Sequence, residues 1–159
     1  MLKSSRMFKQ YKHVHFVGIG GIGMSALAKW FLYEGVNVTG SDVHESEITK
    51  DLQRRGAKIF FGHAHDHVAT DVDLLIYSPA VPDSNHERQA AKERGIREVS
   101  NFEFLGEISH EFSTIVVSGT NGKSTTTAML GLILEAAGYD PTVLVGSLVP
   151  GFKDGNLRV

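Results

Sequence analysis

The sequence predicts an α/β fold, in which a Rossmann-like, parallel-sheet N-terminal domain is followed by the start of a P-loop domain. Three observations support this prediction. Short β-rich runs alternate with helical patterns, which is the order of βαβ units. Several helical patterns end at a glycine that a strand-like run follows within a few residues. Two glycine-rich loops, residues 16–28 and 118–130, each lie between such a strand and a helix.

The elements follow from these patterns in order along the chain. The first helical pattern places apolar side chains one turn apart on a single face, at Met24, Leu27, Ala28, Phe31 and Leu32. Glycine suits the left-handed backbone position just past the end of a helix. Four glycines follow the helical patterns in this way: Gly35, Gly56, Gly95 and Gly138. The predicted strands are His13–Val17, Asn37–Gly40, Lys58–Phe61, Leu74–Tyr77, Arg97–Val99, Thr114–Val117 and Thr142–Val145.

A domain boundary is expected near residues 107–114. Residues 1–108 contain enough strands for a small open sheet, whereas residues 109–159 begin a second βα unit and end in a loop-like stretch. The helix after the second loop carries Met129, Leu130, Ile133 and Leu134, which we expect to pack in a core. The second domain is therefore predicted to be incomplete.

Composition excludes several classes of function. The chain has 159 residues, of which 42% are hydrophobic and 21% charged, as in ordinary folded domains. A net charge of −2 provides no positive field for nucleic acid or an anionic membrane, and no apolar run is long enough to span a bilayer. The absence of cysteine excludes disulfides and fits a reducing compartment. We therefore expect a cytoplasmic protein with a short, basic, solvated N-terminal extension and no nucleic-acid or membrane partner.

The first loop is typical of a diphosphate site. Gly18, Gly20 and Gly23 match G-x-G-x-x-G between a strand and a helix, and Asp42 ends the next strand. The glycines let a diphosphate approach the backbone, and the helix start offers free N–H groups. Asp42 could accept hydrogen bonds from a ribose or a base. The motif leaves the nucleotide open, NAD included, and a packing turn without a ligand is the alternative.

The second loop, "GTNGKST", has the G-K-S core of a phosphate-binding loop. Its amides would cradle phosphates, Lys123 would reach the terminal phosphates and the Ser124 hydroxyl would bind Mg²⁺. Only two residues separate Gly119 from Gly122, where the common form has four. Neither a hydride-transfer enzyme nor a simple kinase needs both loops. Together they predict a protein that holds a diphosphate-bearing substrate and spends ATP on it.

The stretches "VGIGGIGMSALA", "GSD", "GAKIFFGH", "YSPAVPDSN" and "GTNGKSTTTAM" occur in one order. In these stretches the chain resembles the Mur ligase family, from His13 almost to its end. These are ATP-dependent amide-bond ligases of peptidoglycan precursor synthesis, which add amino acids to UDP-N-acetylmuramic acid. The resemblance implies that the sugar carboxylate attacks the γ-phosphate of ATP to form an acyl phosphate and ADP. The incoming amine then attacks the acyl carbon, displaces phosphate and forms the amide. The second domain would then be a P-loop ATPase domain.

The resemblance also implies the site residues. Those expected to bind the UDP-sugar are Gly18, Gly20, Gly21, Ile22, Gly23, Met24, Ser25, Ser41, Asp42, His63, Ser78 and Asn85. Those expected to bind ATP are Gly119, Thr120, Asn121, Gly122, Lys123, Ser124 and Thr125, with Lys123 as the catalytic residue and Ser124 as the Mg²⁺ ligand. ATP and Mg²⁺ are accordingly the expected cofactors.

The added amino acid stays open. The stretch with Met24 and Ser25 is most similar to the member that adds L-alanine, whereas Asn121 and Ser124 are more similar to the member that adds D-glutamate. A related ligase that adds a tripeptide shares the first pattern. Family members carry three domains, so this chain alone is expected to be inactive and to self-associate through its incomplete second domain. A non-catalytic UDP-sugar-binding or NAD-binding module is the remaining alternative.

Two further motifs have two interpretations each. The histidines of "GHAHDH" could bind zinc, but the resemblance implies that His63 approaches the uridine and leaves His65 and His67 solvated. Pro79 and Pro82 could form a plain rigid turn or a wall of the sugar-nucleotide site.

Overall fold

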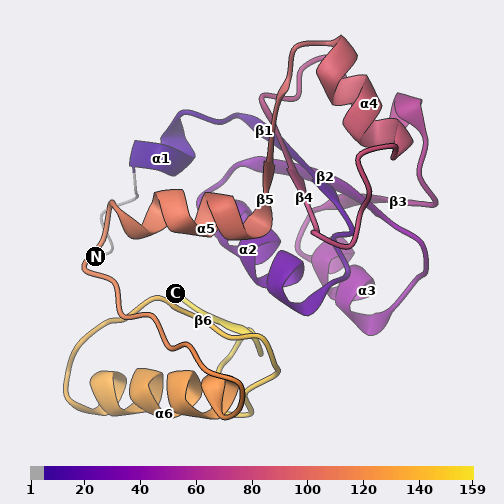
Figure 1. Cartoon of the computed structure of the whole chain (residues 1–159). Coiled ribbons are helices and arrows are strands. Elements are labelled where there is room, and N and C mark those ends of the chain that lie inside the picture. Colours follow the sequence, from indigo (N-terminus) through magenta and orange to yellow (C-terminus); the bar gives the residue numbers. More distant parts are fainter. Residues whose placement is uncertain (1–5) are drawn as a thin grey trace.

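A five-stranded parallel sheet forms the centre of the first domain (Figure 1). The computed structural model describes residues 6–159. The strand order is β3-β2-β1-β4-β5. The bounds are β1 His13–Val17, β2 Asn37–Asp42, β3 Lys58–Phe61, β4 Leu74–Tyr77 and β5 Arg97–Ser100. The predicted α/β class and five of the predicted strands are confirmed.

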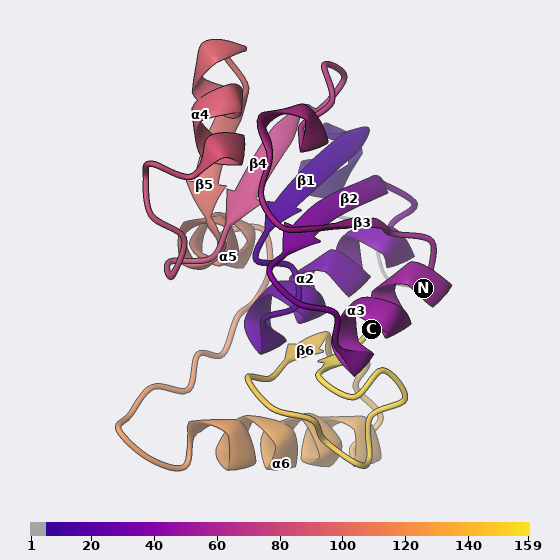
Figure 2. The same ribbon diagram turned by 90° about the vertical axis from the view of Figure 1, so that its right-hand side faces the viewer.

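Helices cover both faces of this sheet (Figure 2). One face packs against α1, α2, α3 and α5, and the other against α4 and the 3₁₀ turn η1. Their bounds are α1 Arg6–Lys9, α2 Ile22–Tyr33, α3 Glu47–Arg54, η1 His65–His67, α4 His86–Glu93 and α5 Asn101–Ser109. Each helical pattern that ends at a glycine is followed by a strand or by the chain segment leading to one, as predicted. The four glycines at helix ends have positive φ, between 66° and 105°.

An aromatic core fastens the N-terminal helix to α2. Phe8 is fully buried, with its ring centroid 4.8 Å from those of Trp30 and Phe31. The expectation of a solvated extension is therefore wrong at Phe8, because its ring completes the apolar layer over α2. The start of that extension, residues 1–5, lies outside the described residues.

The second part of the chain packs beneath α2. It consists of α6 Lys123–Ala136 and the antiparallel pair β6 Val143–Leu144 and β7 Leu157–Arg158. β6 lies between α6 and α2 (Figure 2). The C-terminal stretch was expected to be a loop, which is wrong at β7. Leu157 is 1% exposed in the main core, and its backbone pairs with β6.

The predicted strand Thr114–Val117 is wrong, because no other strand in the described chain lies beside it. Residues 113–118 form an extended connection in which Val116 is 78% exposed. Core packing is also wrong for Met129 and Ile133, which α6 leaves more than half exposed. The buried residue of α6 is Gly131, where a Cβ would lie 2.9 Å from Val143. An apolar groove of about 670 Å³ lies between α5, this connection and α6.

No helix in the described part of the chain combines the length and apolar character that crossing a membrane requires.

Candidate functional site

The glycine loop lies where the strand order reverses direction, between β1 and β4. In open parallel sheets, ligands bind outside the carboxyl ends of the strands at this point. The loops after the two strands touch there. Gly18 has φ +83°, and a Cβ on it would lie 3.1 Å from Cβ of Ser78. The Ser78 amide donates to the carbonyl of Val17 at 3.0 Å.

The carboxyl end of β2 fastens the glycine loop. The amides of Gly18 and Ile19 donate to the Ser41 carbonyl at 2.9 and 3.0 Å. The Gly20 amide donates to Oδ2 of Asp42 at 2.8 Å. A Cβ on Gly20 would lie only 2.8 Å from that same oxygen, so a side chain here would displace the carboxylate. Asp42 therefore orders the loop, whatever contact its carboxylate makes with a ribose.

The start of α2 is the candidate anion site of the glycine loop. Gly21 is its N-cap and provides no side-chain hydrogen bond. The first amides of an α-helix have no acceptor within the helix, and the helix dipole makes this end positive. The amides of Gly20 and Gly21 already donate, to Oδ2 of Asp42 and to the Gly18 carbonyl. Ile22 and Gly23 therefore offer the backbone donors at the sheet edge. Met24 and Ser25, by contrast, have buried side chains, and the Ser25 hydroxyl donates to the Ile22 carbonyl at 2.9 Å.

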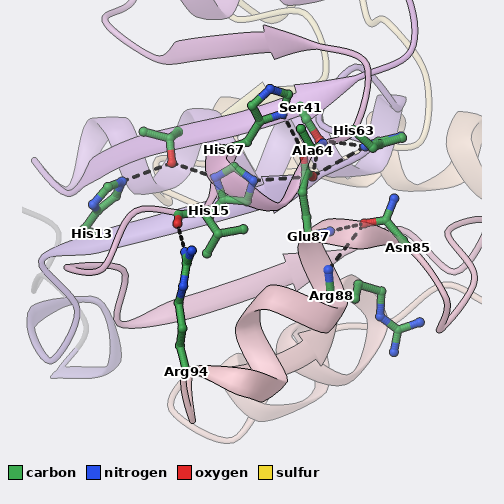
Figure 3. Close-up of polar contacts among 12 residues, drawn as sticks. His13, His15, Ser41, His63, Ala64, His67, Asn85, Glu87, Arg88 and Arg94 are labelled. Atoms are coloured by element: carbon green, nitrogen blue, oxygen red, sulfur yellow. Dashed lines mark hydrogen bonds and ion pairs between the residues drawn. The ribbon is translucent and has the colours of Figure 1, made fainter.

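A buried carboxylate lies behind this edge, on the other face of the sheet (Figure 3). Glu87, in the first turn of α4, is fully buried and accepts a 2.5 Å hydrogen bond from the Ser41 hydroxyl. Three histidines surround it. The Nδ1 atoms of His67 and His63 lie 2.8 and 3.4 Å from its oxygens, and Nε2 of His15 lies at 3.5 Å. We call these five residues the Glu87 cluster.

Electrostatics keep Glu87 ionised. Burial alone would raise its pKa, but the interactions with His15 and the Ser41 hydroxyl outweigh burial and lower the pKa to about 2. Burial lowers the pKa of His15, which is therefore neutral near pH 7. The negative charge of the cluster is the Glu87 carboxylate, which is stabilised by polar contacts with the Ser41 hydroxyl and the histidine rings.

This network fixes the tautomer of His63. Because the Ser41 hydroxyl donates to Glu87, its oxygen accepts from Nδ1–H of His63 at 3.0 Å. In the neutral ring, Nε2 is then the acceptor. His63 is partly exposed and follows β3, so it lies at the ligand-binding edge of the sheet. Its Nδ1–H is already used as a donor to Ser41.

The other histidines take different places. His65 is exposed and contacts Glu93 at 2.9 Å, as expected. His67 was expected to be solvated, which is wrong, because its ring stacks on Phe60 and its Nδ1 contacts Glu87. In residues 6–159 no group of three histidines or carboxylates is arranged to hold a metal ion, so the zinc alternative has no support.

Asn85 positions Glu87. It is the N-cap of α4, and its side-chain oxygen accepts from the amides of Glu87 and Arg88 at 2.9 and 3.3 Å. The Ser78 hydroxyl accepts from the Ala80 amide at 3.4 Å, within the turn after β4. Both residues are therefore tied into the backbone beside the glycine loop, and their contact with a ligand stays a prediction.

The phosphate loop lies in the second part of the chain. Gly122 is the N-cap of α6 in the left-handed conformation, with φ +75°. Lys123 bends back, and its Nζ donates to the carbonyls of Gly119 and Thr120 at 2.6 and 3.2 Å. An exposed loop whose lysine is held by the carbonyls of that same loop fits a phosphate group. Ser124 follows in the first turn of α6, where its hydroxyl could join a metal bound to that phosphate.

Sequence reasoning missed Glu87 and His15. The signal for His15 was the alternation in "HVHFV", which places His13 and His15 on the face opposite Val14 and Phe16. Both histidines contact Oγ1 of Thr39, at 3.0 and 2.8 Å. A strand with two polar residues on a buried face requires polar partners, and α4 supplies Glu87.

Comparisons with known proteins agree with this geometry. Residues 13–113 match the model described as Mur ligase family, catalytic domain. A UDP-N-acetylmuramate–L-alanine ligase of Agathobacter rectalis is 44% identical over 153 residues, which are 96% of this chain and 33% of that protein. The chain therefore spans about a third of the length of the curated relatives it matches.

Two solved structures share the fold. The UDP-N-acetylmuramate-alanine ligase of Thermotoga maritima aligns with a TM-score of 0.86 and 37% identity, over 93% of this chain and 34% of that one. The UDP-N-acetylmuramate:L-alanyl-gamma-D-glutamyl-meso-diaminopimelate ligase of Neisseria meningitides aligns with a TM-score of 0.85 and 28% identity, over 93% and 46%.

Proposed function

Since the chain belongs to the Mur ligase family, we propose that it is the N-terminal part of an ATP-dependent ligase that adds L-alanine to UDP-N-acetylmuramate. The main observation in support is that one chain contains two nucleotide-type loops, one at the start of α2 and one at the start of α6. The glycine loop, at the sheet switch point, would take the diphosphate of the sugar nucleotide. The phosphate loop at the start of α6 would take ATP.

Each unit would contribute its own part of the chemistry. The open start of α2 would neutralise the diphosphate and fix the sugar nucleotide in place. Lys123 would leave the loop carbonyls and reach the terminal phosphates of ATP, while Ser124 would hold Mg²⁺. Bound together, ATP and Mg²⁺ would supply the phosphoryl group that activates the sugar carboxylate. The remaining part of the ligase would bring the amine.

L-alanine is favoured over the other amino acids because the Agathobacter and Thermotoga relatives are both named for it. The second candidate is the ligase that attaches a tripeptide to the same sugar nucleotide. The nearly equal TM-score of the Neisseria structure supports it, but its sequence identity is lower. The units described here bind the shared substrates, so the two candidates differ in a part of the site outside them.

A ligand panel tests the proposal. Calorimetry of this chain with UDP-N-acetylmuramate, NAD and ATP–Mg²⁺ should give measurable binding of the sugar nucleotide and none, or far weaker binding, of NAD. The described chain has a glycine loop that both ligands could use in principle, so NAD is the informative competitor. Tighter binding of NAD than of the sugar nucleotide would replace this proposal with the NAD-binding module.

The substitution Gly20→Val should strongly weaken binding at the first loop. Its Cβ would lie 2.8 Å from Oδ2 of Asp42 and 3.2 Å from Cγ2 of Thr49, so the loop would shift away from β2. We expect Gly20→Val to weaken UDP-N-acetylmuramate binding by about 100-fold, the cost of losing one or two charge-assisted hydrogen bonds.

The matched control is Gly62→Ala. Gly62 is a loop glycine after β3 where a Cβ meets nothing within 4 Å, although its φ of +81° adds some strain. Calorimetry should give the control an affinity within a few-fold of the unmodified chain. Wild-type affinity in Gly20→Val would place the diphosphate away from this loop.

A further inference from the structure

A buried asparagine near the C-terminus contacts the first turn of α2. Asn156 is 1% exposed, and its Nδ2 donates to the Ile22 carbonyl at 2.6 Å and to the Ser25 hydroxyl at 2.9 Å. Its side-chain oxygen accepts from Nζ of Lys29 at 3.0 Å. Every polar atom of this side chain is therefore bonded, and two of its three contacts hold the helix end that carries the anion site.

Charged residues secure the same segment on its outer side. Lys29 is 8% exposed and also contacts the Asp154 carbonyl at 2.9 Å and Asp51 at 3.2 Å. Arg55, the C-cap residue of α3, pairs with the Asp154 carboxylate at 2.6 Å. These ion pairs lie away from the first turn of α2. They hold the segment in place without touching the glycine loop.

The segment also reaches the phosphate loop. A Cβ on Gly146, which follows β6 closely, would lie 3.9 Å from Oγ of Ser124. The amides of Val145 and Val149 donate to the carbonyls of Asn156 and Gly155, at 3.0 and 2.9 Å. Residues 143–158 thus form one hydrogen-bonded unit between the first turn of α6 and the first turn of α2.

The start of α2 needs such support. Its N-cap is glycine without a side-chain hydrogen bond, and a glycine cap stabilises a helix end less than a Ser, Thr, Asn or Asp side chain that accepts from the backbone. The Ser25 hydroxyl bonds back to the Ile22 carbonyl, an arrangement that by itself slightly destabilises a helix. The amide of Asn156 bonds both groups and fixes their positions.

We propose that Asn156 is a positioning residue, through which the C-terminal segment orders the diphosphate-binding end of α2 and aligns it with the phosphate loop. The proposal rests on the proposed function, in that it takes the glycine loop to bind a diphosphate. It predicts that diphosphate binding and docking of residues 143–158 strengthen each other, because coupling between two sites is reciprocal.

The test is Asn156→Asp in this chain, with UDP and uridine as ligands. Aspartate keeps an acceptor for Lys29 but has no N–H for the Ile22 carbonyl. We expect the affinity for UDP, measured by calorimetry, to fall 5- to 20-fold. The affinity for uridine, measured by NMR titration, should change less than twofold, because uridine lacks the diphosphate. Asp154→Ala is the matched control, which removes the Arg55 ion pair of the same segment and should bind UDP within twofold of the unmodified chain.

Equal effects of Asn156→Asp on UDP and uridine, or no effect on either, would overturn the proposal. Absence of UDP binding in the unmodified chain would instead refute the proposed function beneath it. Hydrogen exchange on the unmodified chain provides a measurement that needs no variant. UDP should slow exchange of the Val145 and Val149 amides as well as those at the start of α2. Protection confined to α2 would also overturn the proposal.

Discussion

Replacing Glu87 with alanine is expected to lower the free energy of unfolding by about 3 kcal/mol. The substitution removes the acceptor of the Ser41 hydroxyl and of the His67 ring, and both groups would lose their partner in a buried site. It also frees His63 to change tautomer, because Ser41 no longer donates to a carboxylate. Urea unfolding at pH 7 measures the loss. Glu93→Ala is the control, since Glu93 is an exposed acid on the same helix and should change stability by less than about 0.5 kcal/mol.

The same cluster sets the acid response of the domain. The folded pKa of Glu87 is about 2, below its ordinary value of 4.5, so its contribution is fully present above pH 4.5 and is lost as the pH falls toward 2. Burial also lowers the pKa of His15, so protonation of the unfolded chain begins to reduce stability below about pH 6.5. The Glu87→Gln variant lacks the contribution that the ionised Glu87 carboxylate makes to stability. The difference in unfolding free energy between the unmodified chain and this variant should therefore narrow from pH 5 to pH 3, and a constant difference would contradict the assigned pKa.

The strands of the first domain could be predicted because each is a short β-rich run, and a parallel sheet buries such runs on both faces. Val14 and Phe16 pack toward α2 as the helical pattern requires. The prediction failed at Thr114–Val117, an equally apolar run, because a strand requires a neighbour and β-propensity does not supply one. The failure at Met129 and Ile133 has the same cause. An amphipathic helix face is buried only where another element covers it.

The candidate site was predictable where local geometry demands a residue type, and unpredictable where it depends on contacts distant in sequence. Gly18 has a local signal, because its positive φ disfavours side chains, and Gly20 belongs to the same short glycine motif. Glu87 resembles any acidic residue in the first turn of a helix, where it favours the dipole. Only the packing of α4 against β4 and β5, from which the Glu87 side chain reaches Ser41 and His15, turns it into the buried acceptor of Ser41. Asn156 is similarly unpredictable, since 134 residues separate it from Ile22.

Lys123→Ala is expected to have the largest effect of all on activity. In a full-length ligase that contains this sequence, it should reduce ATP-dependent ligation by about 10²–10³-fold or more, the usual cost of removing one preorganised group that stabilises transferring charge. Nζ of Lys123 is the cation of this loop, and it donates to the carbonyls of Gly119 and Thr120, which a bound phosphate would replace as its partners. Phosphate release coupled to the amino acid measures the loss.

Binding of the sugar nucleotide should survive this change, and that separation makes the prediction specific. The glycine loop is fastened by Ser41 and Asp42 of β2, and none of its contacts involves residues 119–125. Calorimetry with UDP-N-acetylmuramate should therefore give Lys123→Ala an affinity within twofold of the unmodified protein. Thr126→Ala is the control and should keep near-normal turnover, because Thr126 is an exposed, uncharged residue in the first turn of α6 that is not among the expected ATP-binding residues. If Lys123→Ala retained near-normal turnover, the phosphoryl group would have to be stabilised by another cation, and the second loop would lose its assignment as the ATP site.

If the Lys123→Ala variant lost both ligation and sugar-nucleotide binding, the two loops would form one site. The separation of α2 from α6 by β6 argues against that arrangement, since the loops then approach their ligands from different units.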